Sequence, residues 1–203
     1  MKVTSDITSL LDEAREGDEV ALGRILESYS AYMTLLARLQ VGRQLQGKLD
    51  PGDVVQETFL EVHRQIRQFR GSSESEFLAW MRTILVGQIA SMMRRYLGTR
   101  GRDVKLEREL AVQLDQSSQL LDRGLVASRS TPSQHAVRRE QAVLLAEALS
   151  TLPEDYREVI IFRQLEELSF ADVARRMKRS EDSVQKLWVR ALAMLRRSLG
   201  DIT

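Results

Sequence analysis

The sequence predicts an all-α protein with two small helical domains joined by a flexible linker. Only 11 of the 203 residues are glycine and 3 are proline, which leaves few turn residues for a fold of many short strands. Leucine, alanine, arginine, glutamate and glutamine recur instead, and these residues favour helix. Apolar side chains return at three- and four-residue spacing on both sides of a segment rich in serine and glutamine.

The first predicted domain, residues 1–97, opens with a group of helices. Each has an apolar face at helical spacing, and Gly17 separates the first two. These helices are expected over residues 7–16, 19–29 and 32–41. An irregular break then follows, up to residue 49.

A strong start signal opens the next helix. Asp50 can accept a hydrogen bond from an unpaired backbone amide, and Pro51 suits the first helical position. Asp53 stands three residues after the cap, as in a capping box. We expect this helix to reach about Gln68, with a turn over residues 69–72.

A second capping box begins the last helix of this domain. The Ser73 hydroxyl can accept from the Glu76 amide, and the Glu76 carboxylate can accept from Ser73 in return. One side of the helix is apolar and is made by Phe77, Trp80, Met81, Ile84, Leu85, Ile89, Met92 and Met93. The helix should end near Tyr96.

Residues 98–134 are interpreted as a linker. They contain three glycines, many serines and glutamines, and a Pro132 that follows a serine-rich run. We expect at most a helical turn or two within residues 104–121. The segment is longer than most loops inside a domain, which favours a second domain over residues 135–203.

The second domain is expected to end in a helix-turn-helix. Helices are predicted over residues 135–149, 151–165, 169–177 and 180–199. The last two form a short helix and a longer basic helix around a tight turn at Lys178 and Arg179, as in many DNA-binding proteins. An ordinary helical hairpin would give the same pattern, so the motif alone does not decide between them.

Basic residues gather at this motif. The stretch from Arg175 to Arg197 holds eight basic and two acidic residues, which suits a polyanion, although a solvated helix face is an equal alternative. Amides and cations near the start of the longer helix suit base edges, and other arginines suit phosphates. The candidate duplex-contacting residues are Arg176, Arg179, Ser183, Gln185, Lys186 and Arg190.

Two further groups of residues lie in the first domain. One helix face carries an acidic, amide and apolar set, which suits a basic protein partner or is merely a solvated edge: Asp53, Gln56, Glu57 and Leu60. The segment from residue 69 to 96 mixes aromatic and cationic side chains, which can hold unpaired bases, although such aromatics are usually core. Its candidate contacts are Phe69, Arg70, Trp80, Arg82, Gln88 and Arg95.

Three of these candidate contacts lie at or near the predicted turn over residues 69–72. Phe69 and Arg70 flank it, where both side chains can leave the core, and Trp80 either contacts the strand with them or only supports the turn from beneath.

No signature of catalysis or of a cofactor is present in the sequence. The chain has no cysteine and only two histidines, which stand far apart, so neither a metal site nor a catalytic triad is indicated. We expect a non-enzymatic protein without a cofactor. A signal peptide and a long apolar span are also missing, so we expect a cytoplasmic protein without membrane insertion.

Taken in order, these segments resemble the extracytoplasmic-function group of bacterial sigma factors. The matching segments are residues 53–60, residues 69–70 followed by 77–84, residues 149–159 and residues 167–191. The resemblance implies that residues 1–97 are region two, which binds core RNA polymerase through the Asp53 face and recognises and melts the −10 element. It implies that residues 135–203 are region four, which reads the −35 element.

The partners implied are core RNA polymerase and promoter DNA, and an anti-sigma factor is a further partner that the resemblance allows. Lys178 stands where the family usually has glycine, and Ser180 where proline is frequent. A free-standing helix-turn-helix regulator is the main alternative, although it leaves the Asp53 face unexplained. A helical adaptor and a helical hydrolase fit less well, because of the basic stretch and the missing catalytic site respectively.

Overall fold

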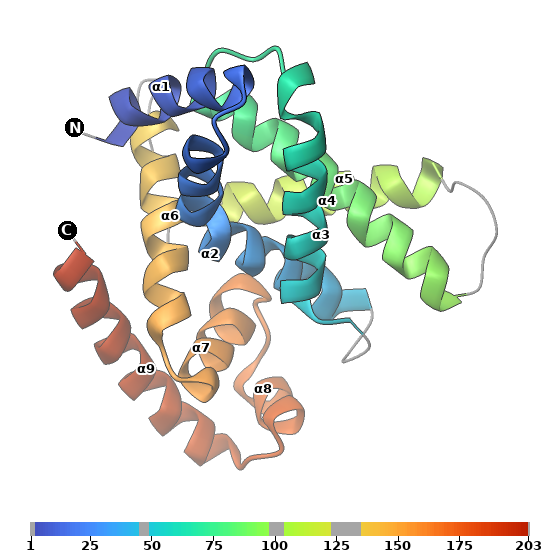
Figure 1. Ribbon diagram of the computed structural model, residues 1–203. Helices are drawn as coiled ribbons and strands as arrows, with labels where there is room; N and C mark the ends of the chain where they lie inside the picture. Colours follow the sequence, from blue (N-terminus) through green and yellow to red (C-terminus); the bar gives the residue numbers. More distant parts are fainter. Residues whose placement is uncertain (1–2, 45–48, 98–103, 123–134, 203) are drawn as a thin grey trace. The chain divides into compact units, whose positions relative to one another are not determined.

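The computed structural model describes residues 3–44, 49–97, 104–122 and 135–202, and in these ranges the regular structure is entirely helical (Figure 1). The chain divides into two compact units, Met1–Gln116 and Ser117–Thr203. The predicted all-α class with two helical domains is therefore confirmed. The finer division at residues 97 and 134 stays a prediction, and residues 98–103 and 123–134 of the predicted linker lie outside the described residues.

The first unit is built on α1 (Val3–Glu16), α2 (Glu19–Gln44), α3 (Pro51–Gln65) and α4 (Glu74–Leu97). α2 packs against α1 and α3, and α3 packs against α4. Large side chains fill the space between these helices and are fully buried, among them Tyr29, Tyr32, Leu36, Phe77 and Met81.

The prediction of separate helices over residues 19–29 and 32–41 is wrong, because α2 is one helix of 26 residues. Ser30 and Ala31 between them carry no helix-breaking side chain, and Tyr29, Tyr32 and Leu36 keep one apolar face in phase. Residues 42–44 of the expected break are helical, since α2 continues to Gln44, and residues 45–48 lie outside the described residues.

The predicted start of α3 is confirmed in detail. Oδ1 of Asp50 accepts from the Gly52 amide at 2.6 Å, and Pro51 occupies the first helical turn. α3 ends at Gln65, and a single 3-10 turn, η1 (Ile66–Gln68), extends the helical path to the predicted end point.

The capping box of α4 is also present. The Glu76 amide donates to Oγ of Ser73 at 3.3 Å, and Oε2 of Glu76 accepts from the Ser72 and Ser73 amides at 2.9 and 3.1 Å. The Ser72 amide and the Ser73 hydroxyl hold the pKa of the Glu76 carboxyl below its usual range. The carboxylate thus ties the turn after η1 to the start of α4.

Within the predicted linker, α5 (Val104–Asp122) is a helix of 19 residues rather than the expected turn or two. No glycine or proline interrupts this stretch, and Leu106, Leu110 and Leu114 recur every four residues. Nη1 of Arg94 in α4 pairs with Oε1 of Glu107 at 3.2 Å, which links α5 to α4.

The second unit contains α6 (His135–Thr151), α7 (Glu154–Ile160), a π-helical turn η3 (Ile161–Leu165), α8 (Phe170–Met177) and α9 (Glu181–Ile202). α9 packs against α6, α7 and α8 (Figure 1). The core of this second unit is formed by apolar side chains that include Leu149, Val159, Ile160, Val173, Val184 and Leu195. The predicted order of helices, with α8 and α9 as the terminal pair, is confirmed.

Candidate nucleic-acid interface

A defined turn joins α8 to α9. The Arg179 amide donates to the Ala174 carbonyl at 2.9 Å and the Lys178 amide to the Arg175 carbonyl at 3.3 Å. Lys178 itself is in the left-handed region, with φ 54° and ψ 44°. This C-terminal closure usually has glycine at that position, because a side chain there is strained.

Side-chain hydroxyls cap both helices of the pair. Oγ of Ser169 accepts from the Asp172 amide at 3.1 Å and donates to the Asp172 carboxylate. Together with Arg175, Ser169 lowers the pKa of Asp172, the Ser169 hydroxyl having the larger effect. Oγ of Ser180 accepts from the Ser183 amide at 3.2 Å, which fixes the start of α9.

α9 has one buried face and one exposed face. Val184, Ala191 and Leu195 are buried, and Trp188 is half-buried, as a core anchor should be. Ser183 is half-buried at the start of the helix. The exposed side carries three of the predicted contacts, Gln185, Lys186 and Arg190.

An exposed valine within this face was missed by the sequence reasoning. Val189 has 66% of its surface exposed and lies one helical turn after Gln185 and Lys186. Val189 follows Lys186 by three residues and Gln185 by four, and this spacing places it on the same helix face. An apolar side chain of this kind suits the methyl group of thymine.

Two of the predicted phosphate contacts are engaged inside the chain. Nη1 of Arg176 pairs with Oε2 of Glu166 at 2.8 Å, and its guanidinium lies 4.4 Å from the centroid of the Phe162 ring. The Glu166 side chain is only 7% exposed. Arg179 pairs with Asp155 of α7. Both arginines therefore brace the helix pair against the preceding helix in the free chain.

Other cations of the motif are bound loosely. Arg175 pairs with Asp172 on the same helix, with its side chain 80% exposed. Nζ of Lys186 pairs with Oδ2 of Asp182 at 2.7 Å, and both side chains are exposed. Exposed pairs contribute little to stability, so a phosphate can replace the carboxylate at small cost.

The predicted protein-binding face of α3 is exposed as a group. Asp53 and Gln56 are exposed, Glu57 is half-buried, and Leu60 keeps 51% of its surface exposed. Glu61 continues this side of α3, and hydrogen bonds from Gln65 and Arg64 lower the pKa of its carboxyl. An exposed leucine among carboxylates and an amide suits a protein partner better than water.

The prediction that Phe69 leaves the core is wrong. Phe69 is 6% exposed and stacks on Trp80 with ring centroids 5.0 Å apart, while Phe77 meets its edge at 5.5 Å. The backbone at Gly71 closes over the ring, so closely that a Cβ at Gly71 would lie 2.8 Å from Cε2 of Phe69. Arg70 is exposed as expected, and Trp80 contacts the turn through its stack on Phe69.

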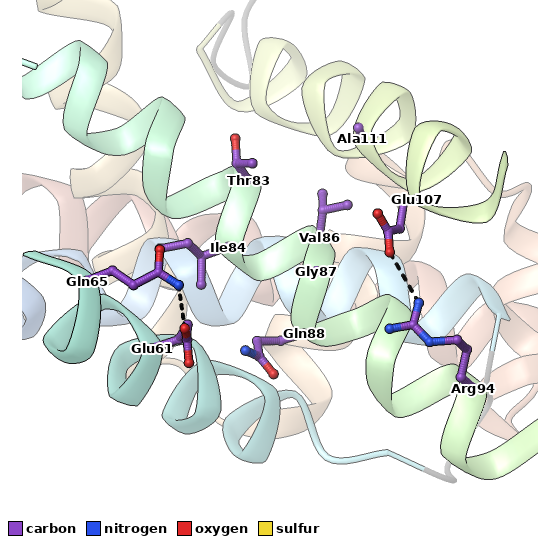
Figure 2. Close-up of a pocket in the computed structure, with 10 residues that line it drawn as sticks. All are labelled: Glu61, Gln65, Thr83, Ile84, Val86, Gly87, Gln88, Arg94, Glu107 and Ala111. Carbon is purple, nitrogen blue, oxygen red and sulfur yellow. Dashed lines mark hydrogen bonds and ion pairs between the residues drawn. The ribbon is translucent and has the colours of Figure 1, made fainter. Parts of the chain in front are cut away.

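The remaining candidates do not converge on this turn. Nη1 of Arg82 donates to the Tyr32 hydroxyl at 3.3 Å. Gln88 lines a pocket of about 610 Å³ between α3, α4 and α5, with Glu61 and Glu107 on its other walls (Figure 2). Arg95 is exposed further along α4. Gln88 follows Trp80 by eight residues, or about 12 Å of helix, so it marks a separate position.

Within the described ranges, no cluster of three or more histidine, cysteine or acidic side chains could hold a metal ion. The helices described there are also too short or too polar to cross a membrane.

Comparisons with known proteins give consistent matches. The family model for sigma-70 region 2 matches residues 29–97, and that for sigma-70 region 4 matches residues 142–195, together more than half of the chain. The ECF RNA polymerase sigma-E factor of Haemophilus influenzae is 29% identical over 188 residues, which cover 92% of this chain and 92% of that protein. The sigma-E factor of Escherichia coli K12 is 27% identical over 165 residues, or 81% and 79% of the two chains.

A solved structure of CnrH in complex with the cytosolic domain of CnrY is 21% identical and covers 98% of this chain and 99% of its own, with a TM-score of 0.36.

Proposed function

Because the chain belongs to the extracytoplasmic-function group of the sigma-70 family, we propose how its surfaces share the work of promoter-specific transcription initiation. The protein is a sigma factor that binds core RNA polymerase and directs it to promoters.

The exposed face of α9 reads the −35 duplex. The observation that carries this step is the row of Gln185, Lys186, Val189 and Arg190, all exposed on a helix whose opposite face is buried. An amide and two cations suit base edges and phosphates in the major groove, and the valine suits a thymine methyl. Arg175 adds a phosphate contact, since its side chain is 80% exposed and pairs with Asp172 on its own helix.

The α3 face docks on polymerase. Asp53, Gln56 and Glu57 offer acceptors to a basic surface, and Leu60 supplies the apolar centre that protein interfaces usually bury. The capped start of α3 holds these side chains on a rigid helix, so little conformational entropy is lost when they bind a partner.

The turn between η1 and α4 acts in promoter opening. Arg70 is the exposed member and approaches the unpaired strand, while Phe69 and Trp80 form the stacked base on which the turn rests. Gln88 and Arg95, further along α4, would follow the strand away from the turn. Arg82 supports α4 through Tyr32 and takes a positioning role.

We also propose that the chain works in the cytoplasm, has no catalytic activity of its own and needs no cofactor. If an anti-sigma factor regulates the chain, it would stop polymerase binding by covering the α3 face and −35 recognition by covering the α9 face.

Reconstitution with core polymerase tests the proposal. Transcripts should start at specific promoters only when the chain is added. In a footprint, the −35 and −10 elements should be protected together by the holoenzyme and only weakly by the chain alone, because polymerase holds both domains on the DNA at once. Tight and sequence-specific protection by the purified chain alone would favour a free-standing regulator instead.

A further inference from the structure

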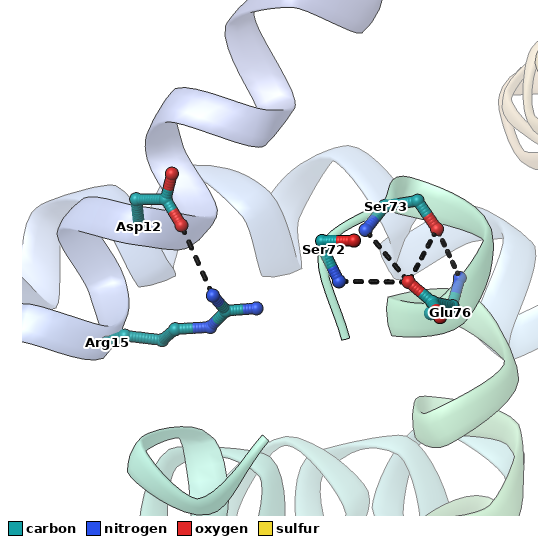
Figure 3. A network of polar contacts seen from close by, with 5 residues as sticks. All are labelled: Asp12, Arg15, Ser72, Ser73 and Glu76. Carbon is teal, nitrogen blue, oxygen red and sulfur yellow. Dashed lines mark hydrogen bonds and ion pairs between the residues drawn. The ribbon is translucent and has the colours of Figure 1, made fainter. Parts of the chain in front are cut away.

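Arg15, which none of the proposed interfaces uses, lies beside the turn between η1 and α4. It stands in the last turn of α1, and its guanidinium carbon is 5.1 Å from the centroid of the Phe69 ring. α1 packs against both η1 and α4, the two elements that the turn connects. Figure 3 shows the side chain extending from α1 toward the side on which Ser72 and Ser73 lead into α4.

One edge of this guanidinium is unused. Nη1 donates to Oδ1 of Asp12 at 3.2 Å. Nε and Nη2 are buried and have no hydrogen-bond partner in the described part of the chain. These two nitrogens form the edge of the planar group that can donate to two oxygens of one phosphate or carboxylate.

The cation–π contact with the Phe69 ring engages the guanidinium but leaves Nε and Nη2 without hydrogen-bond acceptors. A buried donor without an acceptor costs free energy, so an apolar side chain would cover the Phe69 ring at lower cost. The pair with Asp12 offsets little of this, because Asp12 is exposed. The unused edge is better explained by an oxygen-bearing partner that comes from outside the chain.

We propose that Arg15 binds a backbone phosphate of the unpaired promoter strand as that strand passes the turn. This rests on the proposed role of the turn in promoter opening. Exposed Arg67 and Arg70 flank the same turn and supply two further cations to a polyanion, while Asp12 and Glu76 lie beside it as exposed carboxylates. Single-stranded nucleic acid is commonly held by aromatic side chains beside a cationic path, and this arrangement combines both.

The position of Arg15 allows this contact. Its side chain is 26% exposed, and its Nη1 already pairs with the exposed carboxylate of Asp12. A phosphate that displaces Asp12 meets Nη1 first, and rotation of the side chain then presents the buried edge. Arg15 therefore makes this contact only when the unpaired strand is present, and the contact favours the open state of the promoter.

The test uses the complete chain assembled with core polymerase and a promoter fork whose −10 strand is unpaired. Arg15→Gln should weaken fork binding about 10-fold, and the dependence of log affinity on log salt should become shallower by about 0.7, the value for one phosphate of a single strand. Arg24→Gln, which removes an exposed cation of α2, is the matched control and should change neither quantity.

Neutral methylphosphonates placed one at a time in the unpaired strand locate the contact. At one position, neutralisation should weaken binding by the wild-type chain but not by the Arg15→Gln variant. Arg15→Lys should keep the salt dependence, since it keeps the charge, and should lose affinity, since it lacks the double donor edge. Additive losses at every position would overturn the proposal, even if both variants bind less tightly.

Two parallel measurements separate this inference from the proposed function. If Arg70→Gln weakens fork binding and Arg15→Gln does not, the turn acts in opening but the Arg15 contact is refuted. If Arg15→Gln alone weakens it, the Arg15 contact stands and the role of Arg70 fails. If Arg15→Gln weakens binding to core polymerase with an unchanged salt dependence on the fork, the edge holds a protein carboxylate, and the phosphate proposal is refuted.

Discussion

Replacing Lys178 by glycine should stabilise the second unit. Lys178 closes α8 in the left-handed region, with φ 54°, and is one of two non-glycine residues with positive φ in the described ranges. Its side chain clashes with its own backbone there, at a cost of about 1–2 kcal/mol. Glycine removes that strain but adds about 0.5–1 kcal/mol of conformational freedom to the unfolded chain. The net gain should be about 0.5–1 kcal/mol.

The matched control is Lys178→Ala. It removes the same charge beside Arg175, Arg176 and Arg179 but keeps a Cβ in the strained conformation. Its stability should therefore stay near that of the wild type. Thermal unfolding of the complete chain, followed by the fluorescence of Trp188 in a Trp80→Phe background, should show the glycine variant melting a few degrees higher, at about 4–8 °C per kcal/mol. Equal stabilisation by alanine and glycine would show that charge repulsion, and not backbone strain, is relieved.

Three further predictions concern the interfaces. Removing both Asp53 and Glu57 should weaken binding to core polymerase by about 1–4 kcal/mol with unchanged helix content by circular dichroism, whereas unchanged affinity would exclude the α3 face. Arg176→Ala should lower unfolding stability by about 1–2 kcal/mol because Glu166 is left buried and unpaired, while Arg175→Ala should cost less than about 0.5 kcal/mol; equal losses would refute the brace. Gln185→Ala should change −35 sequence preference, and Arg196→Ala should weaken all sequences alike in binding assays with the holoenzyme.

The capped helix starts could be predicted from the sequence because their signals are local. Asp50 with Pro51, Ser73 with Glu76, and Ser169 with Asp172 each act within a few residues. The exposed side of α9 was predictable for the same reason, since helical periodicity alone separates Gln185 and Lys186 from the buried Val184.

The orientation of Phe69 was not predictable from such signals. A turn residue next to an arginine is usually exposed, yet its burial depends on the missing side chain at Gly71 and on Trp80, eleven residues away. The length of α5 was underestimated for another reason. Its polar composition resembles a linker, while a leucine at every fourth position and an ion pair to Arg94 favour a helix.

Counting basic residues also overstates how many can contact DNA phosphates. Breaking the ion pair between Arg176 and Glu166 would leave a nearly buried carboxylate without a partner. Arg176 therefore contributes little to phosphate binding. Arg179 can leave Asp155 more easily, because both side chains are partly exposed. The phosphate contacts therefore fall mainly to Arg175, Lys186, Arg190 and the exposed Arg196 further along α9. With so few contacts the second unit should bind duplex weakly by itself, since each phosphate adds only about 0.9 to the salt dependence. Attachment to polymerase then becomes necessary for useful affinity, which is the behaviour that distinguishes a sigma factor from a free-standing regulator.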